Sequence, residues 1–249
     1  MSLSKFYHRR TLLPFLAKQL KIKSYLEIGV KGGKTFLPLK IRKKYAVDPV
    51  FKIKKDYKRS QIFKFPLNLF AEYYECESNE FFAAYAPMVL KNKKLDMAFI
   101  DGLHTFEQSY IDIVNTLPYL KEDGIMVVHD CSPKSEAAAY PANSIADVKK
   151  INPPGFDGLW SGDVWKIVPK LKLNFPELFI FVIDQDSGLA VISRKPLVNF
   201  SDQLQNIEYT EKDIELWDYS YLNQNRVKLL NLVNDKQLQE VANSLLAYR

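Results

Sequence analysis

The stretch Leu95-Asp96-Met97-Ala98-Phe99-Ile100-Asp101-Gly102-Leu103-His104 has the pattern of a buried strand that ends in an acid and an imidazole. The stretch Gly124-Ile125-Met126-Val127-Val128-His129-Asp130 repeats the pattern at the next strand. In an open α/β sheet, ligands bind outside the carboxyl ends of the strands, so Asp101, His104, His129 and Asp130 are expected to face one pocket. Two carboxylates and two imidazoles can hold a metal ion or move a proton.

A third strand end lies in Ser24-Tyr25-Leu26-Glu27-Ile28-Gly29-Val30-Lys31-Gly32-Gly33, which reads as strand, glycine loop and then helix. Further strands are expected over residues 44–48, 72–76, 178–183 and 189–193. The last two are joined by Asp184-Gln185-Asp186-Ser187-Gly188, a loop suited to a hairpin. The end of the sheet is therefore expected to be antiparallel.

Apolar periodicity predicts a leading helix through Leu12, Leu13, Leu16 and Leu20, and further helices over residues 78–90 and 106–120. Thr105 and Gln108 have the spacing of a capping box for the last of these. Near the C-terminus, Thr210 with Asp213, and later Asp235, are expected to cap two more helices.

Residues 131–163 carry little periodic pattern and many prolines and glycines. Because a loop of this length in a compact domain is usually functional or disordered, and because it follows Asp130 directly, we expect a lid over the pocket. Trp160 and Trp165 either stack on a sugar or other ring there or belong to the core.

Charge is unevenly distributed: residues 1–66 hold 18 Lys and Arg against 3 acids, whereas the remaining 183 residues hold 17 against 26. The first segment therefore suits an anionic partner, such as nucleic acid, phospholipid or an acidic glycan, although a solvated face explains it more simply. Only Cys76 and Cys131 occur, so no disulfide framework is indicated. No apolar run approaches the roughly 20 residues of a membrane span. We expect a soluble, cytoplasmic protein.

The glycine loop has the spacing of the dinucleotide fingerprint, with Glu27 in the first glycine slot. A carboxylate there would repel a pyrophosphate, whereas S-adenosylmethionine has no phosphate and carries sulfonium and ammonium charges. Asp48 ends the second strand, where an acid can hydrogen-bond the ribose hydroxyls that both cofactors share. These residues favour S-adenosylmethionine over NAD.

Taken together, these motifs resemble the class I S-adenosylmethionine-dependent methyltransferases over roughly residues 10–195, and most closely the branch of small sugar and macrolide (macrocin-type) O-methyltransferases. The matching stretches are Leu26–Thr35, Ala46–Pro49, Phe99–Phe106 and Val127–Asp130, and Ser78–Phe82 is similar to the segment that borders adenine. The resemblance implies an α/β, Rossmann-like, doubly wound, seven-stranded sheet with its last strand antiparallel, flanked by an N-terminal helix and C-terminal helices.

The resemblance also implies site roles. It assigns Glu27, Gly29, Gly33, Asp48, Ser78, Asn79 and Asp101 to the cofactor. In macrocin-type relatives, acids at the ends of the fourth and fifth strands hold magnesium and a histidine acts as base, which maps Asp101 and Asp130 to a metal and His104 to the base. His129 stands where those relatives have a second acid. It is expected to be a metal ligand, a second proton carrier, or a packed residue bonded to the backbone. Imidazole suits Mn, Fe or Zn better than Mg²⁺.

The sequence thus predicts an S-adenosylmethionine-dependent O-methyltransferase, assisted by a divalent metal (Mg or another) or by histidine, and acting on a hydroxyl of a sugar, glycan or glycosylated natural product. The alternatives are an RNA methyltransferase and a catalytically silent cofactor-binding protein. Asn152-Pro153-Pro154 mimics a nucleic-acid methyltransferase motif, but it does not follow the fourth strand. We expect residues 1–200 to form the methyltransferase domain and 201–249 to be its helical extension. A homo-oligomer is expected.

Overall fold

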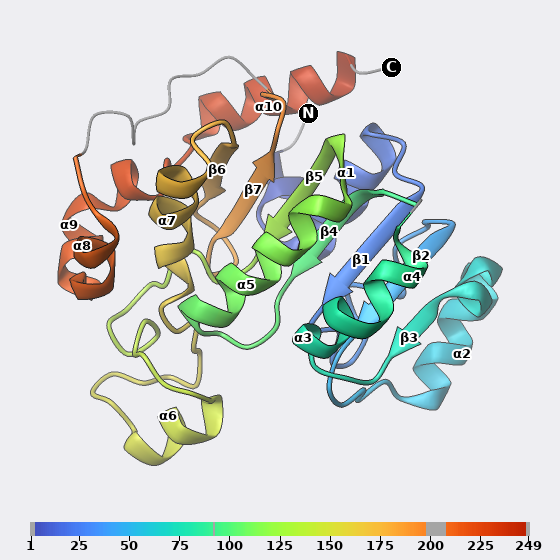
Figure 1. Cartoon of the computed structure of the whole chain (residues 1–249), viewed down its shortest axis with the longest axis horizontal. Helices are drawn as coiled ribbons and strands as arrows, with labels where there is room; N and C mark the ends of the chain where they lie inside the picture. Colours follow the sequence, from blue (N-terminus) through green and yellow to red (C-terminus); the bar gives the residue numbers. More distant parts are fainter. Residues whose placement is uncertain (1–2, 92, 198–207, 248–249) are drawn as a thin grey trace.

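The computed structural model describes residues 3–91, 93–197 and 208–247, and these residues form one seven-stranded sheet between helical layers (Figure 1). The strand order is β3-β2-β1-β4-β5-β7-β6, and β7 runs antiparallel to both of its neighbours. The strands are β1 (Ser24–Ile28), β2 (Lys43–Val47), β3 (Glu72–Tyr74), β4 (Leu95–Ile100), β5 (Leu120–Val128), β6 (Phe179–Ile183) and β7 (Leu189–Ser193). The predicted fold class is confirmed.

Each face of the sheet has its own apolar core. On one face, buried residues of α1 (Arg9–Gln19) and α10 (Asp235–Ala247) pack with β1, β4 and β7. On the other, the core includes residues of α4 (Ala86–Val89), α5 (Phe106–Thr116), α7 (Ile167–Asn174) and α9 (Tyr219–Leu229). The remaining helices are α2 (Lys55–Lys64), α3 (Ser78–Glu80), α6 (Ile145–Ile151) and α8 (Glu211–Leu216). Short 3-10 turns occupy Leu3–Phe6 (η1), Pro66–Phe70 (η2), Leu117–Tyr119 (η4) and Val164–Lys166 (η5).

The helix expected directly after Gly33 is absent, because residues 31–38 form turns. Gly33 has a φ of 68° and Pro38 lacks an amide hydrogen, so the segment between them is too short for a stable helix. The sequence reading missed α2, whose residues show no clear amphipathic period. α7 was also missed, although it buries Ile167, Val168 and Leu171.

The helix predicted over residues 78–90 forms in three pieces, with a π-helical turn over Phe81–Tyr85 (η3) between α3 and α4. The Ala86 amide donates to the Phe81 carbonyl five residues back. Pro87 follows immediately and has no amide hydrogen to continue the normal ladder, which explains the local rewinding.

The helix predicted over residues 106–120 ends early, since α5 stops at Thr116 and a 3-10 turn follows with Pro118 in it. β5 then starts at Leu120, so Lys121 to Gly124 lie in a strand that has a register shift against β4. Only half of the expected capping box forms: Thr105 accepts from the Gln108 amide, while the Gln108 side chain turns to Asp112.

The C-terminal segment behaves partly as expected. Thr210 and Asp213 form a reciprocal capping box at α8. At α10, the capping contact is made by Asn234 and Gln237 instead of Asp235, with the Gln237 amide donating to Asn234 Oδ1. Among the described residues, no helix combines the length and apolar character needed to cross a bilayer.

Candidate active site

The carboxyl ends of β1, β4 and β5 meet at one edge of the sheet. The backbone ladder continues one step beyond each strand: the Asp101 amide donates to the Ile28 carbonyl (2.9 Å) and the His129 amide to the Ile100 carbonyl (3.0 Å). Gly29 has a φ of 86°, and a Cβ there would lie 1.9 Å from the Asp101 carbonyl oxygen, so only glycine fits. The tight approach of these turns brings the predicted residues Asp101, His129 and Asp130 together.

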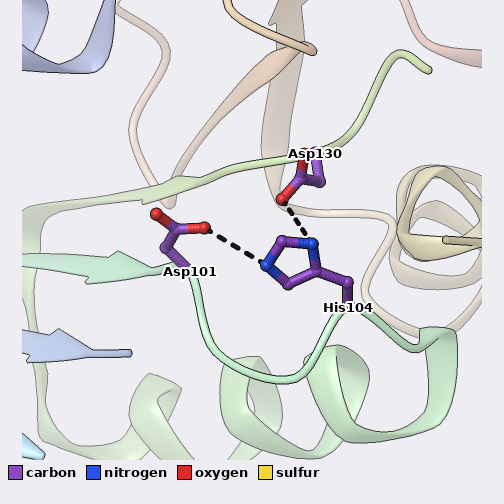
Figure 2. Close-up of side chains that lie close together, drawn as sticks. All are labelled: Asp101, His104 and Asp130. Atoms are coloured by element: carbon purple, nitrogen blue, oxygen red, sulfur yellow. Dashed lines mark ion pairs between the residues drawn. The ribbon is translucent and has the colours of Figure 1, made fainter. Parts of the chain in front are cut away.

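His104 lies between two carboxylates (Figure 2). Its Nδ1 is 3.2 Å from Asp130 Oδ2 and 2.8 Å from the Trp160 carbonyl oxygen, and its Nε2 is 3.8 Å from Asp101 Oδ1. Because carbonyl and carboxylate oxygens only accept, Nδ1 carries the proton in the neutral ring. Nε2 then holds a lone pair on the side of Asp101, which is the arrangement a general base or a metal ligand needs.

His129 is 7% exposed and uses both ring nitrogens. Nδ1 lies 2.8 Å from Asp130 Oδ2 and 3.2 Å from Asp101 Oδ1, while Nε2 lies 2.6 Å from Arg9 Nη1. Burial lowers the pKa of His129, and the carboxylates, Asp130 first, raise it by more, so its pKa moves upward. The Arg9 contact opposes this, since a guanidinium only donates and needs a lone pair on Nε2. His129 Nδ1 donates to Asp130 Oδ2 and so fixes the Asp130 carboxylate.

Two residues that the sequence reading missed complete the cluster. Arg9 Nη1 lies 2.8 Å from Asp186 Oδ1, and the Arg9 amide donates to Asp186 Oδ2 at 2.8 Å. Arg9 Nε is also 3.6 Å from Asp101 Oδ2. Burial alone would raise the pKa of Asp186. The hydrogen bonds from His129 and from the Arg9 amide lower it by more, so the pKa of Asp186 lies well below its ordinary value. Asp186 was read as a turn residue and Arg9 as part of a basic run, and neither pattern carried a site signal.

The segment predicted to be a lid folds over the cluster. Trp160 stacks on His104 with ring centroids 5.4 Å apart and planes at 15°, and Ser161 Oγ donates to Asp130 Oδ1 at 2.8 Å. Gly162 has a φ of 60°, and a Cβ there would lie 1.9 Å from the His104 carbonyl oxygen. Trp165 instead lies in the core, 1% exposed. Asp130 has a φ of 65°, a strained conformation of the kind found at functional sites.

Asp48 lies beside the glycine loop at the end of β2, as predicted. Its Oδ2 accepts from the Lys31 amide (2.7 Å) and its Oδ1 from the Val50 amide (2.8 Å). Each carboxylate oxygen has a second lone pair, so the group can still accept from ribose hydroxyls. Gly33, at the end of the loop, packs against Ile53 and leaves little room for a side chain.

Glu27 does not face the cleft in this structure. It is fully buried, and its two oxygens accept from Tyr25 Oη and Thr35 Oγ1, each at 2.5 Å. Burial raises the pKa of Glu27 to about 8, against the lowering effect of those two bonds. The carboxyl is therefore mostly neutral at pH 7, and its predicted repulsion of a pyrophosphate is weaker than the sequence suggested. Glu27 supports the glycine loop from beneath.

Ser78 and Asn79 belong to a polar network at the start of α3. Gln108 Nε2 lies within hydrogen-bond distance of Ser78 Oγ (3.2 Å), Asn79 Oδ1 (3.2 Å) and Asp112 Oδ1 (2.9 Å). Burial raises the pKa of Asp112 to about 6. Gln108 and Asp112 are thus further members of this group that sequence reasoning did not select, and they hold Ser78 and Asn79 in place.

A cavity of about 380 Å³ opens between α1 and the glycine loop. It is lined by Arg9, Arg10, Pro14, Lys34, Thr35, Pro38 and Tyr57. Arg9 links this cavity to the His129 cluster, and Thr35 links it to Glu27. The described residues also place Asp101, His104 and Asp130 so that one ligand atom of each lies within 4.8 Å of the others, a set that can hold a cation.

Comparison with solved structures identifies the fold. The chain is similar to the O-methyltransferase TomG from Streptomyces achromogenes, involved in tomaymycin synthesis and solved with SAM, at 12% identity, with 73% of this chain and 77% of that chain covered and a TM-score of 0.51. It is also similar to the SAH-bound Podospora anserina methyltransferase PaMTH1, at 17% identity, 76% and 78% coverage and a TM-score of 0.50. A third similar structure is cofactor-bound Rv0187 from MTB, at 15% identity, with 74% of this chain and 79% of that chain covered and a TM-score of 0.51.

The fold is of the Rossmann-like type found in these methyltransferases, with the antiparallel strand that the sequence predicted. Residues 26–131 match the sequence profile of the family described as "Methyltransferase domain". That span runs from β1 to the residue after Asp130, and it includes the glycine loop and the strand ends that carry Asp48, Asp101 and His129. No curated protein sequence matches the chain.

Proposed function

We propose that this protein is an S-adenosylmethionine-dependent O-methyltransferase that acts on a hydroxyl of a sugar, glycan or glycosylated natural product. The observation that carries the proposal is His104, whose Nδ1 is held by the Trp160 carbonyl and whose Nε2 lies on the side of Asp101 at the carboxyl edge of the sheet. The choice of a sugar acceptor rests on the resemblance to the macrocin-type branch.

The cofactor would be held by the loop after β1 and by the end of β2. Gly29 and Gly33 allow close approach of the backbone, Asp48 offers lone pairs to ribose hydroxyls, and Ser78 and Asn79 lie where the family resemblance places the adenine. S-adenosylmethionine supplies an electrophilic methyl group when bound. Glu27 acts on this site indirectly, through its bond to Thr35.

The acceptor hydroxyl is a weak acid and has to lose a proton as the new bond to carbon forms. His104 Nε2 can take that proton, while its Nδ1–H remains bonded to the Trp160 carbonyl. Asp101 and Asp130 flank the ring and stabilise the imidazolium that results. The stack on Trp160 fixes the plane of the ring and keeps water from one of its faces.

The same cluster fits a divalent cation by its donor set of two carboxylates and an imidazole. Asp101 and Asp130 would hold the ion, and a bound cation would stabilise the negative charge of an alkoxide formed from the acceptor. The sequence predicted His129 as the third ligand. His104 also lies within reach of both carboxylates, and an ion held by its ring would take the place of its role as base. The presence of an imidazole favours Mn, Fe or Zn over Mg²⁺.

The deciding experiment incubates the protein with methyl-labelled S-adenosylmethionine and a panel of sugars, nucleotide sugars and glycosides, followed by mass spectrometry of the product. The proposal expects label on an oxygen, lost in His104→Ala and unchanged in the exposed control Lys150→Gln. Cofactor binding without transfer to any acceptor would favour a silent cofactor-binding protein. Transfer to RNA alone would favour the RNA methyltransferase. The expected homo-oligomer stays a prediction, which light scattering can test.

A further inference from the structure

The segment from Val50 to Phe70 exposes apolar side chains to an unusual degree. Among the described residues, fifteen large hydrophobic side chains are exposed, and five of them come from this short segment. They are Val50 (55% exposed), Phe63 (90%), Leu67 (36%), Leu69 (65%) and Phe70 (71%). The others are scattered over many elements, as single exposed hydrophobic residues usually are. The segment includes α2 and η2, which lie beside the edge strand β3 (Figure 1).

Buried polar contacts force these side chains outward. Asn68 is 1% exposed, and its Nδ2 donates to the carbonyls of Leu37 (3.1 Å) and Gln61 (3.0 Å), while its Oδ1 accepts from the buried Lys44 Nζ. With Asn68 turned inward, its neighbours Leu67 and Leu69 turn outward. The bond from Asn68 to Gln61 also holds η2 against α2. Leu67 and Leu69 are therefore held outward by the packing of η2 on α2.

The same surface is strongly basic. Residues 50–70 hold Lys52, Lys54, Lys55, Lys58, Arg59 and Lys64 against a single acid, Asp56. Arg59 Nη1 lies 3.8 Å from Asp56 Oδ1, and both side chains are largely exposed. This ion pair therefore contributes little to stability. Lys58 Nζ lies over the Tyr73 ring at 3.8 Å, and the other lysines of the segment point to solvent. We call this combination of exposed apolar and basic side chains the α2 surface.

We propose that the α2 surface docks the protein on an anionic phospholipid bilayer. Apolar side chains gain free energy when they enter the boundary of the hydrocarbon, and Lys and Arg around them are attracted to acidic headgroups. The charge complementarity is direct, because this surface carries five more cations than anions. A second copy of the chain fits less well, since a two-fold contact would bring identical basic surfaces face to face. RNA would use the cations and leave Val50, Leu67 and Leu69 without a role.

The test measures co-sedimentation of the full chain with vesicles of phosphatidylcholine alone and with equimolar phosphatidylcholine and phosphatidylglycerol. The proposal expects binding to the acidic vesicles that weakens with added salt. Each lysine near an acidic bilayer strengthens binding by about fivefold. The variant Lys54→Gln/Lys55→Gln should therefore bind the acidic vesicles about 25-fold more weakly than the wild type. Its matched control, Lys149→Gln/Lys150→Gln, removes two exposed lysines from α6 and should bind like the wild type. Circular dichroism verifies that each variant is folded.

The apolar arm of the test uses Phe63→Ser/Phe70→Ser, with Met88→Ser/Leu216→Ser as the control for exposed apolar residues elsewhere. Binding should be lost in the first pair and kept in the second. Absence of binding to acidic vesicles at low salt, or equal losses in variant and control, would overturn the proposal. It would also be overturned if the first pair converted an oligomer into a monomer in light scattering. The proposal does not depend on methyl transfer, so it stands or falls separately from the proposed function.

Discussion

The substitution Glu27→Gln isolates the cost of a carboxyl group buried beneath the glycine loop. The ordinary pKa of glutamic acid is 4.5, and burial raises the pKa of Glu27 to about 8 in the folded chain. Between these values the unfolded chain ionises while the folded chain keeps its proton, so the free energy of unfolding falls as pH rises. At 1.36 kcal/mol for each pKa unit, the loss is at most about 5 kcal/mol by pH 8, and about 3 kcal/mol at pH 7. Glutamine stays neutral at every pH.

The assay is urea unfolding of both proteins between pH 4 and pH 9. The glutamine side chain of the variant can still accept from one hydroxyl and donate to the other, so the two proteins should have similar stabilities below pH 4.5. As pH rises further, the free energy of unfolding of the wild type should fall relative to that of the variant, so that the variant is the more stable protein at pH 8. The control Glu122→Gln, at an exposed position in β5, should change stability by less than about 0.5 kcal/mol throughout. A difference between wild type and Glu27→Gln that does not change with pH would refute the reasoning, because Glu27 would then be ionised inside the fold.

The remaining predictions concern ligands and the lid. Asp48→Ala should weaken S-adenosylmethionine binding by ~1 to 3 kcal/mol in calorimetry, because a buried acceptor is lost, and unchanged affinity would remove Asp48 from the site. His104→Ala should lower kcat by ~10² to 10⁴ with cofactor affinity kept, and a normal kcat would exclude it as the base. Asp130→Asn should abolish the dependence of activity on a metal ion. Full activity of the wild type in excess EDTA would refute the hypothesis that a metal assists the reaction. Gly162→Ala should destabilise the fold clearly more than Gly155→Ala in thermal unfolding, since only at Gly162 does a Cβ collide with backbone; equal losses would contradict the docked lid.

The parts of the fold that the sequence predicted well are those with local signals. Alternating and continuous apolar runs located all seven strands, and the loop after β6 predicted the antiparallel β7. Of the helices that were missed, α2 has almost no apolar face and α7 is a short run that buries Ile167, Val168 and Leu171. The helix expected after Gly33 failed because Pro38 leaves it too few hydrogen bonds.

The site was predictable as far as its residues stand at strand ends. Asp101, His104, His129 and Asp130 were found from the chain alone and do meet. Arg9 and Asp186 were not, because nothing local distinguishes an arginine at a helix start or an aspartate in a hairpin from a surface residue. They reach the cluster from positions 177 residues apart.

The sequence by itself determined the order of the strands, the class of fold and the chemical groups at the carboxyl edge, because hydrophobic periodicity and strand-end residues are local properties. The tertiary structure alone decided how those groups behave. It buried Glu27 and neutralised it, bonded His129 on both ring nitrogens, fixed Nδ1 of His104 against the Trp160 carbonyl and turned Phe63 and Phe70 outward. Burial, hydrogen-bond partners and nearby charge set the state of each group, and they come from residues far away in the chain.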